Sequence, residues 1–143
     1  MSGQARALRV LVVEGNDAHA QLAVRVLESA GYACARATNA ERALELIAAS
    51  APDLVLMDLI LPGISGLEAI GRLRAAEATR SVRIIAVTSY RSDFPARDCS
   101  LTGADGYIAK PYHYADLIDL AHEVLQRPRE KSGGGGNAEG SNA

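Results

Sequence analysis

The sequence has only two cysteines, no long apolar run and no concentration of basic residues. Cys34 and Cys99 form neither a C-x-x-C motif nor a metal-ligand spacing, and we expect both to be reduced and structural. The formal net charge is -2 and Lys and Arg are spread along the chain, so we expect no nucleic acid partner. No apolar run approaches the roughly 18 residues of a membrane-spanning helix, and residues 1–6 lack the apolar core of a signal peptide. These absences favour a cytoplasmic protein with no membrane partner.

The length and the hydrophobic content fit one compact domain. The chain has 143 residues, of which 48% are hydrophobic, and this is enough to bury a core but not to build two domains. We expect a short lead over 1–7, one domain over 8–126 and a tail over 127–143. The tail is rich in Gly, Ser and Asn, a composition that predicts disorder.

Short apolar runs typical of strands alternate with helical patterns along the domain. The predicted strands cover residues 8–13, 32–37, 54–57, 83–87 and 106–109. Such alternation predicts parallel strands joined by right-handed helical crossovers. The expected fold class is therefore α/β, a flavodoxin-like (βα)5 three-layer sandwich with the parallel sheet order 2-1-3-4-5.

A helical pattern follows each predicted strand. The first, over 17–30, places Leu22, Val26 and Leu27 on one apolar face, and the last covers 114–126. The fourth is weaker and spans 92–102. Two capping boxes predict the starts of the second and third helices, Thr38 with Glu41 and Ser65 with Glu68.

Polar side chains follow four of the predicted strands. Glu14 follows the first, Asp58 the third, Thr88 the fourth and Lys110 the fifth. Because the carboxyl ends of parallel strands meet at one edge of a sheet, we expect these side chains to converge on one crevice. A carboxylate nucleophile, a second carboxylate to help hold a cation, a hydroxyl and an ammonium suit phosphoryl transfer. Three histidines show no ligand spacing and are expected to be solvated: His19, His113 and His122.

Three segments resemble those of the receiver domains of two-component response regulators. They are 52–68 around Asp58, 86–89 with Thr88 and 103–111 with Lys110 followed by proline, and the resemblance extends over about 8–126. It implies a single-domain response regulator in which Asp58 accepts a phosphoryl group from a histidine kinase or phosphotransfer protein. It also implies that Lys110 pairs with the phosphoryl oxygens, that Thr88 moves to the phosphate and that Tyr107 follows it inward. The bond between Lys110 and Pro111 is expected to be cis.

The resemblance further implies a signalling module and not an enzyme, with at most self-phosphorylation from small donors and self-dephosphorylation. A phosphatase that uses an aspartyl-phosphate intermediate would place a second Asp two residues after Asp58, where this sequence has Ile60. A flavin carrier of the same fold would have a Ser/Thr-rich phosphate loop after the first strand, which is also missing. Both classes are therefore disfavoured.

The segment after the first strand departs from the family pattern. Receivers normally have two acidic residues there, whereas Glu14 is followed by Gly15. The resemblance implies a Mg²⁺ site built by Asp58, the backbone carbonyl of Ile60 and Glu14, with binding weakened by the missing carboxylate. Asp17 could replace that carboxylate, but it is better explained as an acidic residue in the first turn of a helix.

Two functional interpretations stay open. In the first, phosphorylation alters a face built by the fourth helix, fifth strand and fifth helix, which binds a downstream protein and could also form a homodimer. In the second, the chain is a pseudo-receiver, an interaction module that docks without phosphorylation, and Gly15 is the argument for it. Aromatic residues suited to an interface cluster in this region: Tyr90, Phe94, Tyr107, Tyr112 and Tyr114.

Overall fold

The computed structural model describes residues 6–89 and 103–128. Its elements in chain order are β1 (Arg9–Val13), α1 (Asp17–Ser29), β2 (Ala33–Ala37), α2 (Ala40–Ala49), β3 (Leu54–Asp58), α3 (Gly66–Ala75), β4 (Arg83–Thr88), β5 (Gly106–Ala109) and α5 (Tyr114–Gln126). The predicted helix over 92–102 lies outside the described residues, as do Tyr90, Phe94 and Cys99. So do residues 1–5 of the predicted lead over 1–7 and residues 129–143 of the predicted tail over 127–143. Among the described helices, none combines the length and the apolar character needed to cross a membrane.

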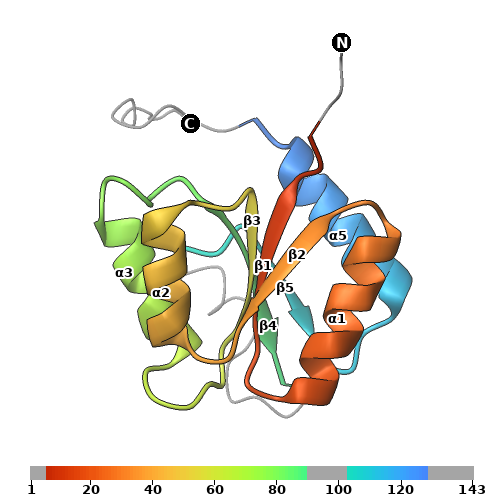
Figure 1. Cartoon of the computed structure of the whole chain (residues 1–143), viewed down its shortest axis with the longest axis horizontal. Helices are drawn as coiled ribbons and strands as arrows, with labels where there is room; N and C mark the ends of the chain where they lie inside the picture. Colours follow the sequence, from red (N-terminus) through yellow and green to blue (C-terminus); the bar gives the residue numbers. More distant parts are fainter. Residues whose placement is uncertain (1–5, 90–102, 129–143) are drawn as a thin grey trace, which may run out of the picture.

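The five strands form one parallel sheet in the order β2-β1-β3-β4-β5. Figure 1 shows α2 and α3 on one face of this sheet and α1 and α5 on the other. The predicted α/β class and strand order are confirmed. Because β1, β3 and β4 are covered on both faces, their side chains are almost entirely buried, which is why they read as continuous apolar runs in the sequence.

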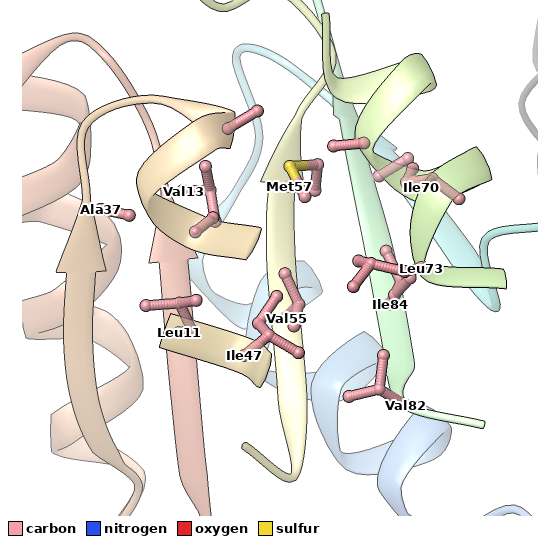
Figure 2. Close-up of a cluster of buried hydrophobic side chains, with 14 of the residues drawn as sticks. Leu11, Val13, Ala37, Ile47, Val55, Met57, Ile70, Leu73, Val82 and Ile84 are labelled. Atoms are coloured by element: carbon pink, nitrogen blue, oxygen red, sulfur yellow. The ribbon is translucent and has the colours of Figure 1, made fainter. Parts of the chain in front are cut away.

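Successive residues of each central strand point to opposite faces and feed two separate hydrophobic clusters. Leu11 and Val13 pack under α2 and α3, whereas Val10 and Val12 pack under α1 and α5. Figure 2 shows the first cluster, in which Ile47, Ile70 and Leu73 descend from the two helices onto the sheet. This two-sided core fixes the strand ends at which the polar residues lie.

The buried face of α1 differs from the prediction. Val26 and Leu27 are buried as expected, but the side of α1 nearest the sheet is otherwise lined by Ala20 and Ala23. Leu22 is 39% exposed, so its assignment to the apolar face was wrong. Small side chains at positions 20 and 23 let the helix lie close to β1. Hydrophobic periodicity does not reveal this preference for alanine over leucine.

The second helix is capped by a different residue from the one predicted. Asn39 is the N-cap, and its side-chain oxygen accepts a hydrogen bond from Arg42 N at 2.7 Å. Thr38 therefore does not cap α2. Glu41, its predicted partner, instead accepts a hydrogen bond from Ile64 N at 3.2 Å, in the loop between β3 and α3. The predicted capping contact between Glu41 and Thr38 is thus replaced by a contact between Glu41 and Ile64, which are 23 residues apart.

The third helix begins at the predicted capping residue and packs directly on the end of β3. The Ser65 hydroxyl accepts a hydrogen bond from Glu68 N at 3.1 Å. The next residue is Gly66, where a Cβ atom would overlap the Asp58 carbonyl oxygen and lie 2.8 Å from Leu59 Cα. Only glycine allows this approach of two backbones, which sets the distance between α3 and the end of β3.

Cys34 lies on the edge strand β2, is partly buried and forms no disulfide. Burial, together with the charge of Glu28, raises the pKa of its thiol to about 11. The thiol is therefore protonated at neutral pH and weakly reactive, which fits the expectation of a structural cysteine.

Candidate functional site

The carboxyl ends of β1, β3 and β5 border a cleft of about 600 Å³. Parallel strands that are covered by helices on both faces leave this edge of the sheet open, as expected for the fold. The cleft is lined by Glu14, Gly15, Asn16, His19, Asp58, Ile60, Leu61, Pro62, Ser89 and Lys110. The predicted residues Glu14, Asp58, Ile60 and Lys110 are thus brought together, although they come from three different parts of the chain.

The ammonium group of Lys110 lies between two carboxylates. Its Nζ donates to Glu14 Oε1 at 2.7 Å and to Asp58 Oδ2 at 2.9 Å. The side chains of Glu14 and Asp58 are only 10% and 7% exposed, and that of Lys110 is 22% exposed. Two carboxylates with so little access to water require a cation between them, and Lys110 provides it.

Burial and hydrogen bonding oppose each other in setting the pKa values of this trio. Burial alone would raise the pKa of Glu14, but hydrogen bonds from Lys110 and Asn16 N outweigh it, so the pKa is lowered. Burial keeps the pKa of Asp58 above its ordinary value despite hydrogen bonds from Ile60 N and Lys110. Burial would lower the pKa of Lys110, yet its bonds to Glu14 and Asp58 raise it. Lys110 is therefore charged at neutral pH, and Asp58 is the carboxylate of this trio whose pKa burial raises.

The two oxygens of the Asp58 carboxylate have separate partners. Oδ1 accepts a hydrogen bond from Ile60 N at 2.9 Å, while Oδ2 accepts from Lys110. The backbone next to it stays in register with β4, because Leu59 N donates to Val87 O at 3.0 Å. The carboxylate is thereby fixed in orientation at the wall of the cleft.

Arg36 on β2 holds the segment that follows β1, a role that the sequence did not reveal. Its Nε and one terminal nitrogen donate to the backbone carbonyl of Glu14 at 3.1 and 2.8 Å. Its other terminal nitrogen pairs with Asp17 at 2.8 Å. Asp17 is 81% exposed and does not line the cleft, so its interpretation as a first-turn helix residue is favoured over that of a substitute metal ligand. In this loop Glu14 is fixed at both its backbone and its side chain.

His19 is the second residue of the site that sequence reasoning missed. It lies in the first turn of α1, where Asn16 caps the helix and accepts from His19 N at 2.9 Å. Its Nδ1 is 3.0 Å from Lys110 Nζ. The ring is exposed, as expected, but it stands at the cleft and not on a remote surface. A signal was available, because the first turn of a helix that follows β1 lies at the same sheet edge as the strand ends.

Thr88 and Tyr107 are not among the residues that line the cleft, although Ser89, which follows Thr88, is. Thr88 is buried at the end of β4, and its carbonyl accepts a hydrogen bond from Lys110 N at 2.7 Å, which ties the strand to the lysine segment. The peptide bond between Lys110 and Pro111 is cis, as the resemblance implies. Tyr107 pairs with Ala86 in the sheet register, is 44% exposed and does not line the cleft. The structure therefore does not bring Tyr107 into the site.

The other described tyrosines of the predicted partner face differ in burial. Tyr112 packs against the hydrophobic cluster under α5, and burial raises its pKa. Tyr114, at the start of α5, is 53% exposed. Tyr107 and Tyr114 are thus the aromatic residues that the described part of this face presents to solvent.

The donors in the cleft suit a hard divalent cation held with the help of water. No group of three His, Cys, Asp or Glu side chains within 6–89 and 103–128 is arranged to hold a metal by itself. Glu14 and Asp58 offer carboxylate oxygens and the Ile60 segment offers backbone, a set that fits Mg²⁺, which binds through one or two carboxylates and keeps several waters. A Cβ atom at Gly15 would lie 3.2 Å from Pro62 Cδ, so a larger residue at this wall of the cleft requires the proline ring to shift by a few tenths of an ångström.

Comparisons with known proteins agree on one family. The sequence profile described as response regulator receiver domain matches residues 10–122. The polar-differentiation response regulator DivK of Brucella anthropi is 35% identical over 116 residues, which cover 81% of this chain and 94% of DivK. The phosphate regulon transcriptional regulatory protein PhoB of Pseudomonas aeruginosa is 35% identical over 118 residues, which cover 82% of this chain but only 52% of PhoB. The chain thus spans about half the length of PhoB and nearly all of DivK.

Solved structures give the same result. A CheY-like response regulator receiver domain protein from Methanospirillum hungatei aligns with a TM-score of 0.76 and 29% identity, covering 84% of this chain and 94% of the other. The receiver domain of a sensor histidine kinase from Pseudomonas aeruginosa, which has a magnesium ion coordinated in its active-site cleft, aligns with a TM-score of 0.77 and 28% identity, covering 84% and 98%. The fold, the cleft at the strand ends and the sequence match together place this chain in the response regulator receiver domain family.

Proposed function

We propose that this receiver domain accepts a phosphoryl group on Asp58 from a histidine kinase or phosphotransfer protein of a cytoplasmic two-component pathway. The observation that carries the proposal is the single ammonium group of Lys110 placed between the carboxylates of Glu14 and Asp58 at an open cleft. A group of this kind, fixed before the reaction, can stabilise the charge of a phosphoryl group without reorganisation.

In the proposed reaction an oxygen of Asp58 forms a bond to phosphorus, and the bond from phosphorus to the donor breaks. With acetyl phosphate as a small donor, acetate leaves with the electron pair, so no general base is required. Mg²⁺, when bound, would neutralise charge on the phosphoryl oxygens, and Glu14, Asp58 and the carbonyl of Ile60 are the residues that would hold it. Lys110 would direct an N–H of its ammonium group to a phosphoryl oxygen, and Thr88 would supply a hydroxyl to the phosphate.

The experiment is intact-protein mass spectrometry after incubation with acetyl phosphate and Mg²⁺. We expect one phosphoryl adduct in the wild type and none in Asp58→Asn, which keeps the size of the side chain. An adduct that persists in Asp58→Asn, or no adduct in the wild type even with a phosphorylated histidine donor, would contradict the proposal.

The second candidate is a pseudo-receiver that binds its partner without phosphorylation. Gly15 supports it, because the family normally has a second acidic residue there and Mg²⁺ binding should be weak without it. A wild type that stays unmodified while Gly15→Asp gains an adduct would favour this alternative.

Output is proposed to occur through the face that includes β5 and α5, where Tyr107 and Tyr114 are exposed. Binding partners captured by the wild type and by Asp58→Ala, each with and without acetyl phosphate, distinguish the two functions. A phosphorylated receiver gains or loses partners with the donor only when Asp58 is present. A pseudo-receiver binds the same partners in all four samples.

A further inference from the structure

Three acceptors surround the ammonium group of Lys110. Its Nζ lies 2.7 Å from Glu14 Oε1, 2.9 Å from Asp58 Oδ2 and 3.0 Å from His19 Nδ1. A lysine ammonium has three N–H donors and no acceptor, so each proton has one partner. Nδ1 of His19 must therefore accept, which requires a neutral ring with its proton on Nε2.

The three acceptors differ in charge and in exposure. Glu14 and Asp58 are carboxylates whose side chains are at most 10% exposed, and their hydrogen bonds to the ammonium are charge-assisted. His19 is an exposed, neutral acceptor at the cleft. It is the partner that Lys110 can release at the lowest free-energy cost when an anion enters.

The position of His19 is itself fixed by the fold. It stands in the first turn of α1, and its backbone N–H is held by the side chain of the capping residue Asn16 at 2.9 Å. The same Asn16 donates its backbone N–H to Glu14 Oε2 at 3.1 Å. One residue thus joins the histidine and the carboxylate that share Lys110.

We propose that His19 is a positioning residue for phosphorylation, because it holds the third N–H of Lys110 toward the open cleft, where a phosphoryl oxygen of the donor replaces the imidazole. This inference rests on the proposed function of Asp58. It concerns the orientation of Lys110 before transfer, and no atom of His19 is transferred or bonded covalently. Water could accept the same proton, but it would not hold the ammonium in one direction.

The test compares two variants with a distant control. His19→Asn keeps an acceptor at the place of Nδ1, His19→Leu removes it, and His122→Leu alters an exposed histidine on α5. We expect His19→Leu to slow phosphorylation by acetyl phosphate about three- to tenfold, less than the loss caused by removing an electrostatic donor itself. His19→Asn and His122→Leu should stay within about twofold of the wild type, on the same reasoning.

A second readout does not depend on phosphorylation. The ¹⁵N–¹H NMR signal of the Lys110 ammonium, recorded on the unphosphorylated protein, should shift or broaden in His19→Leu and be preserved in His19→Asn. An unchanged Lys110 signal in His19→Leu, or a failure of His19→Asn to restore it, would overturn the inference. If the wild type accepts no phosphoryl group, the proposed function fails while this signal still decides whether His19 orients Lys110.

Discussion

Lys110 Nζ lies 2.9 Å from Asp58 Oδ2, and the same ammonium is 2.7 Å from Glu14 Oε1. The two carboxylates are therefore held together by one cation that the chain itself supplies. Each of them is more buried than Lys110. We therefore expect the stability of the fold and the proposed reactivity of the cleft to depend on the same three side chains.

Removing that cation should destabilise the protein in a pH-dependent way. In Lys110→Met two poorly solvated carboxylates face each other, and we expect a loss of about 2–3 kcal/mol near neutral pH. This lies at or below the lower end of the roughly 3–5 kcal/mol for a broken buried pair, because Lys110 is partly exposed. In the wild type the lowered pKa of Glu14 contributes stability above its unfolded pKa of about 4.3, and this is lost as pH falls through the folded pKa.

In Lys110→Met the same carboxyl groups titrate at higher pH, so the penalty is present above their folded pKa values and disappears in acid. The difference between the two proteins should accordingly shrink as pH falls from neutral to about 3.5. Urea unfolding at both pH values measures it. A constant difference would show that Lys110 stabilises by packing and not by charge.

Introducing a carboxylate at position 15 should strengthen Mg²⁺ binding. We expect Gly15→Asp to raise the affinity by about tenfold, because Mg²⁺ prefers carboxylate oxygens and the cleft already holds two. The new Cβ atom meets Pro62 Cδ at 3.2 Å, so the proline ring has to yield by a few tenths of an ångström. Gly15→Ala makes the same contact without the charge and is the matched control in isothermal titration calorimetry. Equal Mg²⁺ affinities for Gly15→Asp and Gly15→Ala would show that the added carboxylate does not bind the cation.

The two partners of Arg36 should differ in their contributions to stability. Arg36→Met leaves the Glu14 carbonyl without its two donors, and we expect a loss of about 1–2 kcal/mol. Asp17→Asn removes only an ion pair whose carboxylate is 81% exposed, and the change should stay within about 0.5 kcal/mol. Chemical denaturation of both variants tests this order. If Asp17→Asn costs as much as Arg36→Met, the ion pair and not the carbonyl contact fixes the loop.

Two glycines of α3 should respond to alanine in opposite directions. At Gly66 a Cβ atom overlaps the backbone of Asp58 and Leu59, so Gly66→Ala should destabilise by about 2 kcal/mol or more and also disturb phosphorylation. At Gly71, exposed in the same helix, a Cβ atom meets nothing within 4 Å, and Gly71→Ala should stabilise by about 0.5–1 kcal/mol. Thermal unfolding of the pair is the measurement. A neutral Gly66→Ala would mean that α3 can move away from β3 at little cost.

The sheet order and the convergence of Glu14, Asp58 and Lys110 could be predicted because they follow from alternation and strand polarity. The alternation of strands and helices and the polarity of the strands are properties of the whole chain. An error of a few residues in the bounds of one element leaves them unchanged. The position of Leu22 could not be predicted in the same way. Its hydrophobicity predicted a position in the core. In the structure α1 lies close to the sheet, and the alanines at positions 20 and 23 take the buried positions instead.

The side-chain contacts of the cleft were the least predictable part. Thr38 with Glu41 matches a capping box, but Glu41 has a better partner in the backbone of Ile64, and Asn39 takes over the cap. His19 and Lys110 are 91 residues apart, and nothing in either local sequence points to the other. Such pairs depend on side-chain directions at the strand ends, which hydrophobic periodicity does not encode.

Hydrogen bonds hold the loop between β3 and α3 at several points. Ile60 N is bonded to the Asp58 carboxylate, Ile64 N to Glu41, and Gly66 N to the Leu59 carbonyl at 3.1 Å. Ordering a free backbone costs about 1–2 kcal/mol per residue in conformational entropy. A cation or phosphoryl group that enters the cleft meets a wall whose backbone is already held at these points, so less of its binding free energy is spent on ordering that backbone. We expect this rigidity to offset part of the weakening of Mg²⁺ binding that we propose for a site with glycine at position 15.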